Sequence, residues 1–283
     1  MIRFILVILA LIVLTLLLLP LQLLGIAFNL RWQRTIPHIY HRILCALAGV
    51  RIHQTGHRSP DTPVLILANH VSWLDICVIS AVTPVVFVAK SEVAGWPVFG
   101  WLAKLQRTVF IDRERRQKTG AATEEIAGRL LGGDAVVLFA EGTSNDGTRI
   151  LPFKSALIGA VHHALGTSTH HEQITVQPMS VAYTRFDGLP MGRALRERVA
   201  WYGDTDLIPH FIGVLSSGAI DVTVSWGEAL ALDINTDRKQ TARNAEAAVR
   251  RMTVAALRAG SPQPSVPAGA MTFGTAGISA SNS

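Results

Sequence analysis

The N-terminal part of the chain is strongly apolar. Residues 4–30 contain no charged side chain, and a helix of that length can cross the roughly 30 Å hydrocarbon core of a bilayer. A cleaved signal peptide is the alternative, but its apolar region would span only about 7–15 residues and end in a small-x-small site. Pro20 and Gln22 interrupt the run and would also permit a bent hairpin within one leaflet. Apolar residues recur at helical spacing through residues 32–58, so we expect an N-terminal membrane-associated helical segment over residues 1–58.

After this segment, short apolar and β-branched runs alternate with helix-like stretches. The predicted strands are residues 64–68, 85–89, 108–111, 135–140, 174–183 and 220–226. The predicted helices are residues 118–131, 153–165 and 241–258. This alternation predicts an α/β fold with a mixed, partly parallel sheet and helices on its faces. We place this domain at residues 59–259 and expect residues 260–283, rich in Ser, Pro, Ala and Gly, to form a disordered tail.

Composition and charge narrow the possible partners. The chain has 283 residues, a formal net charge of +6 and a mean hydropathy of +0.33. A basic excess favours anionic partners such as lipid headgroups, nucleic acid or an acidic carrier protein. The basic residues are dispersed and no recognition motif is present, so we expect no nucleic-acid binding. Nothing in the pattern indicates a metal or another cofactor. Arg31, Arg34 and Arg42 follow the apolar segment, which favours a cytoplasmic position for the folded domain.

Polar side chains follow four of the predicted strands. In chain order they are Asn69 and His70, Lys90, Asp112 and Arg113, and Glu141, Gly142 and Thr143. If these strands are parallel, their carboxyl ends meet at one edge of the sheet, which is where open α/β folds bind ligands. We therefore expect these groups to form one site.

His70 and Asp75 offer two interpretations. Ser72-x-x-Asp75 resembles a capping box, in which Asp75 only caps a helix that begins after Ser72. Alternatively, Asp75 orients His70, and His70 acts as a general base. These residues alone leave both open, and the other polar groups at the strand ends favour the dyad. The chain has no G-x-S-x-G elbow and no P-loop, so the nucleophile would come from the substrate, most simply as a hydroxyl.

These residues resemble the motifs of the glycerolipid acyltransferase family, of the lysophosphatidate-acyltransferase type. The motif N-H-x-x-x-x-D is matched at residues 69–75, and F-P-E-G-T-R-S reads FAEGTSN at residues 139–145. The second and fourth motifs are matched by Lys90, Pro97, Gly100 and Arg113, and by Pro178. The match runs in the family's order from about residue 64 to residue 183. It implies an acyltransferase of the α/β class.

The resemblance also implies a reaction. A fatty acyl group would pass from an acyl carrier protein or coenzyme A thioester to the hydroxyl of a lysolipid at the membrane. His70 would remove the hydroxyl proton, and Asp75 would orient His70. The acceptor or the donor's phosphate would be bound by Lys90, Arg113, Glu141, Gly142 and Thr143.

One departure from the family's pattern bears on the acceptor. Ser144 stands where the third motif has an arginine, which is thought to help hold the acceptor's phosphate. Arg149 lies nearby and could replace that charge. Residues 141–157 and 201–204 look most like the bacterial branch that acylates lyso-ornithine lipid, whose headgroup is a zwitterionic amino acid. We therefore predict a lyso-ornithine lipid O-acyltransferase of the bacterial inner membrane.

Two alternatives remain open. The first is a 1-acyl-sn-glycerol-3-phosphate acyltransferase that makes phosphatidic acid. The second is a non-catalytic, membrane-associated lipid-binding protein on the same scaffold. The second would be expected to lack His70, Asp75 or Glu141, and all three are present.

Overall fold

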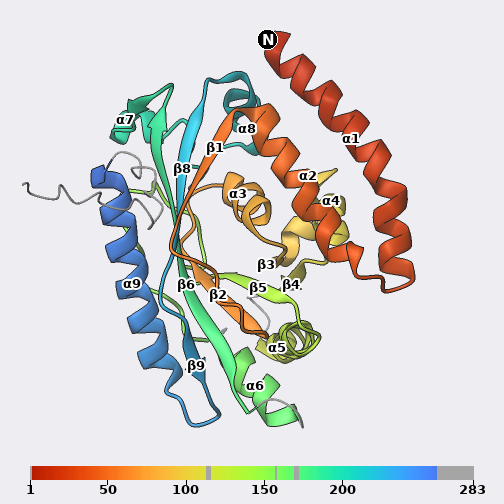
Figure 1. Ribbon diagram of the computed structural model, residues 1–283, viewed down its shortest axis with the longest axis vertical. Helices are drawn as coiled ribbons and strands as arrows, with labels where there is room; N and C mark the ends of the chain where they lie inside the picture. The colour runs from red at the N-terminus through yellow and green to blue at the C-terminus, as the bar shows by residue number, and fades with distance from the viewer. Residues whose placement is uncertain (1, 113–115, 157, 169–171, 260–283) are drawn as a thin grey trace, which may run out of the picture.

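The computed structural model describes residues 2–112, 116–156, 158–168 and 172–259 (Figure 1). Its strands are β1 (Val50–Thr55), β2 (Val64–Ala68), β3 (Val86–Lys90), β4 (Val109–Ile111), β5 (Ala135–Phe139), β6 (Ile174–Phe186), β7 (Leu189–Pro190), β8 (Ile220–Trp226) and β9 (Leu230–Leu232). The longer helices are α1 (Ile2–Ala27), α2 (Trp32–Ala48), α3 (Leu74–Val82), α4 (Phe99–Leu105), α5 (Arg116–Leu131), α6 (Gly159–Thr167), α8 (Leu207–Ser216) and α9 (Arg238–Ala259). The predicted tail and Arg113 lie outside the described residues.

The strands form a mixed sheet in the order β1-β8-β6-β2-β5-β3-β4. The run from β6 to β4 is parallel, whereas β8 pairs antiparallel with β6. β7 and β9 also pair antiparallel with β6. The predicted fold class, a partly parallel sheet with helices on its faces, is therefore confirmed.

Alternating side chains of each central strand enter two different cores. On β2, Val64, Ile66 and Ala68 pack under α1, α2, α3 and α8. Leu65 and Leu67 face the other way, toward α5, α6 and α9. Both faces of β2 are thus covered, which explains its unbroken apolar sequence. In Figure 1, α9 lies on one side of the sheet, with α1, α2 and α3 on the other.

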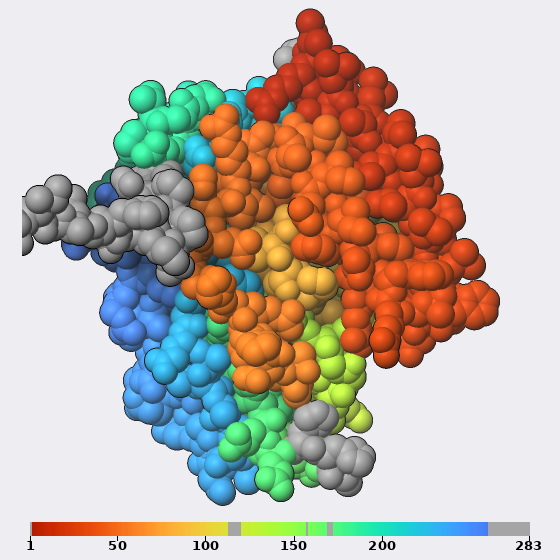
Figure 2. Space-filling model, viewed as in Figure 1, coloured from red at the N-terminus to blue at the C-terminus, as the bar shows by residue number. Residues whose placement is uncertain are grey.

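Helix α1 packs antiparallel to α2, and together they form one side of the molecular surface (Figures 1 and 2). α1 is one continuous helix with Pro20 inside it, so the alternative of a hairpin within this segment is wrong. α1 has the length and composition of a membrane span. Large apolar side chains exposed along it are Ile2, Ile5, Leu6, Leu9, Ile12, Val13, Leu16, Leu17, Leu21, Leu23, Leu24 and Ile26.

Two predicted helices have different limits in the structure. Helix was expected as far as residue 58, but α2 ends at Ala48, and Gly49 adopts a left-handed φ of 75° that favours glycine. Residues 50–55 are instead the edge strand β1, which pairs in parallel with β8. Helix was also expected from residue 153, but α6 begins at Gly159. The backbone N–H of Phe153 instead donates to Glu246, so it does not take part in a helix.

Candidate active site

Three of the four strand ends that were expected to form one site come together, whereas Asp112 after β4 is not among the residues that line the cavity. β2, β3 and β5 lie side by side, and the residues that end or follow them line one cavity of about 550 Å³. Those residues are His70, Lys90, Gly142, Thr143 and Ser144. Further from the strands, the walls are apolar and come from α1, α2, α4 and α8. The cavity therefore joins a small polar region to a much larger apolar one.

His70 and Asp75 form a hydrogen-bonded pair. His70 Nδ1 lies 2.8 Å from Asp75 Oδ2, and Asp75 is fully buried. The same oxygen accepts the backbone N–H groups of Val71 and Ser72, at 2.7 and 3.0 Å. Asp75 thus caps the chain before α3 and orients the imidazole, so the contacts that both interpretations require are present, and the role of His70 as a general base stays a prediction. The helix itself begins at Leu74, two residues after Ser72, which was expected to be its N-cap residue.

The imidazole of His70 is held on a second side by an aromatic ring. The rings of His70 and Phe139 stack, with centroids 3.9 Å apart and planes 15° apart. Because Asp75 engages Nδ1, the neutral tautomer keeps its proton there and leaves Nε2 free to accept another. The His70 side chain is 17% exposed and lines the cavity, so a ligand in the cavity can reach the imidazole.

Tyr183 completes the surroundings of Asp75 and was not found from the sequence. Its hydroxyl donates to Asp75 Oδ1 at 2.7 Å from within β6. Burial raises the pKa of Tyr183 well above its ordinary value, which keeps the hydroxyl protonated as a donor. Asn69 follows β2 and links it to β6. Its side-chain amide donates to the C=O of Val181 on β6 and accepts the N–H of the same residue. Nothing in the sequence distinguishes Tyr183 from an ordinary core residue.

Glu141 lies behind the cavity wall and is buried. Its Oε1 accepts the backbone N–H of His70 at 3.1 Å, and its Oε2 accepts the N–H of Leu151 at 3.1 Å and the side chain of Asn145. These contacts engage both oxygens within the protein and tie the His70 turn to the loop after β5. Burial also raises the pKa of Glu141 to about 7. Direct acceptor binding by Glu141 remains a prediction.

Gly142 occupies a tight turn beside the cavity. Its φ of 76° is in the left-handed region, and an added Cβ would lie 2.9 Å from Lys154 Nζ. The positive φ favours glycine here, and a larger residue would also displace the flexible end of Lys154. Lys154 is a cation near the site that the sequence analysis did not single out. Thr143 and Lys90 are exposed and line the cavity, so both are placed to meet a ligand.

Aromatic residues surround the cavity near its polar region. Trp96 and Trp201 meet edge to face with centroids 5.9 Å apart, and both line the cavity together with Tyr202. Trp73 packs against Phe211 of α8. The segment at residues 201–204, which the sequence linked to a particular branch of enzymes, therefore contributes directly to this site.

A histidine oriented by a buried carboxylate, beside a largely apolar cavity, is the arrangement expected of an enzyme that acts on an apolar substrate. Comparison with known proteins agrees. The family model described as acyltransferase matches residues 49–182. A lyso-ornithine lipid O-acyltransferase from Brucella abortus is 50% identical over 90% of this chain and 96% of its own length. The chain therefore belongs to the acyltransferase family.

Other relatives vary in how much of the chain they match. A lyso-ornithine lipid O-acyltransferase from Rhizobium meliloti is 44% identical over 84% of this chain and 82% of its own. A 1-acyl-sn-glycerol-3-phosphate acyltransferase from Neisseria gonorrhoeae is 42% identical, but over 40% of this chain and 45% of its own. The crystal structure of the LPA acyltransferase PlsC from Thermotoga maritima superposes with a TM-score of 0.59, covering 90% of this chain and 96% of that one. At 18% identity, this match supports the fold alone.

Proposed function

We propose that this protein is a lyso-ornithine lipid O-acyltransferase. The acceptor's hydroxyl oxygen attacks the carbonyl carbon of an acyl thioester, an ester bond forms, and the carbon–sulfur bond breaks. The hydroxyl proton leaves through His70 and is returned to the departing thiolate. The products are ornithine lipid and a free thiol.

The observation that carries the reaction type is the His70–Asp75 pair at the cavity wall. Asp75 holds the proton of His70 on Nδ1, so Nε2 is the nitrogen that accepts the hydroxyl proton. Asp75 then stabilises the imidazolium that forms. The substrate's own hydroxyl is the nucleophile, so the mechanism requires no covalent acyl-enzyme.

The apolar part of the cavity suits fatty acyl chains. Its walls include Leu11, Leu18 and Leu19 of α1 and Ile36 and Leu44 of α2. Burial of methylene groups against such walls contributes about 0.8 kcal/mol each. Chains held there would approach His70 from the side of the membrane-associated helices, which aligns the thioester with the acceptor hydroxyl.

We assign the polar part of the cavity to the acceptor headgroup and the donor. Lys90 and Thr143 would contact their polar groups, and Gly142 would allow close approach of the backbone. Glu141 would act mainly by holding the His70 turn in place. Arg113 keeps its proposed role in binding an anionic group. The donor would be a thioester of acyl carrier protein or coenzyme A, and the positive net charge suits either.

The acceptor is proposed from two observations. The relatives named for lyso-ornithine lipid match this chain over most of its length, whereas the match to the Neisseria gonorrhoeae enzyme named for 1-acyl-sn-glycerol-3-phosphate covers 40% of it. Ser144, which replaces the family's arginine, lines the cavity. A site without that guanidinium favours a headgroup that carries no phosphate.

We further propose that the protein lies at the bacterial inner membrane, with the α/β domain on the cytoplasmic side. Polar contacts tie both ends of α1 to α2, and the contact near its C-terminal end also reaches α4 of the α/β domain. Arg3 donates to Ala48 O at 2.9 Å, and Gln22 donates to Gln33 O and Leu105 O at 3.1 and 2.6 Å. The exposed apolar face of α1 would therefore enter the bilayer while the helix stays docked on α2.

The test is acyl transfer in membranes that contain the full-length protein. Labelled acyl carrier protein thioester is offered with lyso-ornithine lipid and with lysophosphatidate in parallel. Membranes without the protein serve as the blank, and the His70→Ala protein is measured beside the wild type. We expect transfer mainly to lyso-ornithine lipid and none above background in the variant. Transfer mainly to lysophosphatidate would refute the acceptor assignment and leave the acyltransferase assignment intact.

A further inference from the structure

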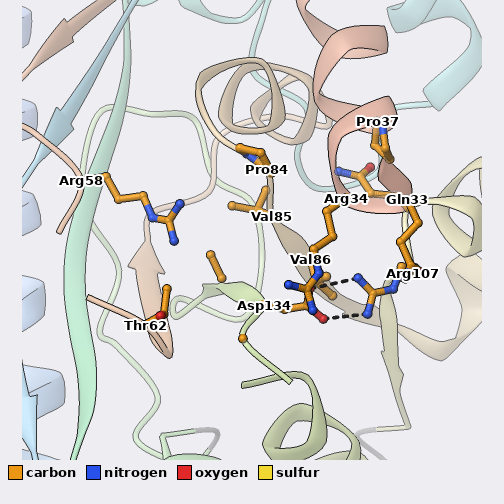
Figure 3. Close-up of a pocket in the computed structure, with 13 residues that line it drawn as sticks. Gln33, Arg34, Pro37, Arg58, Thr62, Pro84, Val85, Val86, Arg107 and Asp134 are labelled. Atoms are coloured by element: carbon orange, nitrogen blue, oxygen red, sulfur yellow. Dashed lines mark hydrogen bonds and ion pairs between the residues drawn. The ribbon is translucent and has the colours of Figure 1, made fainter. Parts of the chain in front are cut away.

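A second cavity, of about 230 Å³, lies at the amino ends of the parallel strands, whereas His70 follows the carboxyl end of β2. Figure 3 shows the residues that line it. Several of its lining residues lie just before β2, β3 and β5, as Thr62, Val85 and Asp134 illustrate, and others belong to α2. The catalytic cavity lies beyond the carboxyl ends of these same parallel strands. The second cavity is therefore a separate place on the molecule, although both share Pro37 and Gln106 as wall residues.

The second cavity carries an excess of positive charge. Its charged lining residues are Arg34, Arg58, Arg107 and Asp134. Three guanidinium groups and one carboxylate give a formal charge of two positive among the described lining residues. The carboxylate is already paired within the protein. Asp134 accepts hydrogen bonds from two nitrogens of Arg107 at 3.0 and 2.8 Å and forms an ion pair with Arg34 Nε at 2.8 Å (Figure 3).

Arg58 is the cation that this network leaves uncompensated. It points into the cavity from the opposite wall (Figure 3). Its Nη1 donates to Thr83 Oγ1 at 3.1 Å, its Nε is buried without a partner, and within the described residues no carboxylate pairs with it. A buried donor without an acceptor is destabilising, because it loses its hydrogen bonds to water and gains none in return. The pairing of Arg34, Arg107 and Asp134 can be explained as a structural link between α2 and β5, but Arg58 cannot.

The second cavity lies near the C-terminal end of the apolar helix α1. Arg34 belongs to the first turn of α2, a few residues after α1 ends at Ala27. Between them, Phe28 is 70% exposed and Trp32 is 47% exposed. Aromatic and basic residues beside the end of an apolar helix mark the level of the lipid headgroups. An anion at this depth is most simply the phosphate of a phospholipid.

We propose that this cavity binds the phosphate of an anionic phospholipid headgroup. Arg58 contacts the phosphate oxygens, and the Arg107–Asp134 pair forms the fixed wall behind them. Arg34 adds its Nη1 from the rim, because its Nε and Nη2 already donate to Asp134 and to Gly132 O at 2.8 and 2.6 Å. Guanidinium groups suit this role because they donate in pairs to phosphate oxygens. The bound lipid is neither acceptor nor product, since His70 lies at the other end of the sheet.

The test measures the melting temperature of the full-length protein in mixed micelles. Phosphatidylglycerol is titrated against phosphatidylcholine as the zwitterionic control. A ligand that binds only the folded state raises the melting temperature as its concentration exceeds Kd. We expect phosphatidylglycerol to raise it by several degrees and Arg58→Gln to weaken the apparent affinity about tenfold or more. Arg51→Gln is the matched control, because Arg51 is exposed on the edge strand β1 and lines neither cavity.

The remaining arms separate the sources of the anion. Inorganic phosphate at the same concentration is expected to give a much smaller shift, and an equal shift would overturn the lipid assignment in favour of a soluble anion. No shift with phosphatidylglycerol, or an undiminished shift in Arg58→Gln, would overturn the site. If Arg58→Gln does not fold, Arg34→Gln, whose side chain is 40% exposed at the rim, takes its place with the same expected weakening.

Discussion

The hydroxyl of Tyr183 donates to Asp75 Oδ1 at 2.7 Å, while His70 and two backbone N–H groups use the other carboxylate oxygen. Four donors thus hold one buried carboxylate in a single orientation. Tyr183 lies on β6, whereas His70 and Asp75 follow β2. The Tyr183–Asp75 hydrogen bond therefore links two neighbouring strands beside the proposed general base.

We predict that Tyr183→Phe lowers kcat by about tenfold with little change in KM. The variant removes a hydrogen bond to a charged group, a type that contributes roughly 1.5–3 kcal/mol, and loosens the carboxylate that orients His70. The pH profile of kcat should shift as well, which simple loss of stability would not cause. Ser180→Ala is the control, since Ser180 is a buried hydroxyl on the same strand that contacts Thr253. An unchanged profile in Tyr183→Phe would contradict the positioning role.

His70→Ala and Asp75→Asn should both nearly abolish transfer. Loss of a general base typically costs about 10²–10⁴-fold in rate, and the asparagine at position 75 removes the charge that stabilises the imidazolium. The His70 variant should keep a normal melting temperature because the imidazole is partly exposed. Asp75→Asn should melt lower, because the buried carboxylate also accepts two backbone N–H groups. A His70→Ala protein with near wild-type turnover would refute the base assignment.

The sequence predicts the sheet and the location of the site well, for a physical reason. Strands buried on both faces are continuous apolar runs, and parallel strands end together at one edge, so the positions of His70, Lys90 and Gly142 follow from the pattern. The edge strand β1 was missed because Val50 stands three residues after Leu47 and so continues the helical spacing, whereas the strand is fixed by its pairing with β8.

Contacts between distant segments could not be predicted in the same way. Tyr183 meets Asp75 across 108 positions, and the sequence offers no sign that this buried ring faces a carboxylate. Glu141 was expected to meet the acceptor, yet the structure directs both of its oxygens to protein donors. Likewise, the sequence does not show that Arg58 and Asp134 line one cavity, because folding must first place the starts of several strands beside α2.

Glu141 should make stability depend on pH. Since burial raises its pKa to about 7 from an ordinary 4.5, the folded protein retains this proton where the unfolded chain has lost it. The contribution to the free energy of unfolding is complete below pH 4.5 and is lost as the pH rises through about 7, by about 3 kcal/mol at most. Glu141→Gln cannot titrate, so its melting temperature should change less between pH 4.5 and 7.5. Parallel curves for the two proteins would contradict this role.

Ser144→Arg should move the preference from lyso-ornithine lipid toward lysophosphatidate. Ser144 lines the cavity beside Thr143, and an arginine there restores the family's residue and supplies two donors for a phosphate. We expect the ratio of kcat/KM for lysophosphatidate over lyso-ornithine lipid to rise about tenfold or more, since a charge-assisted pair contributes roughly 1.5–3 kcal/mol.

The controls for this change separate charge from size. Ser144→Gln adds length without charge and should leave the ratio near that of the wild type. Ser144→Ala should do the same, because the serine forms no hydrogen bond through its hydroxyl within the described residues. If the ratio does not move in Ser144→Arg, residue 144 does not set the acceptor preference. The headgroup would then be selected by other groups, and the next cations to exchange are Lys90, which lines the cavity, and Lys154, which lies beside Gly142.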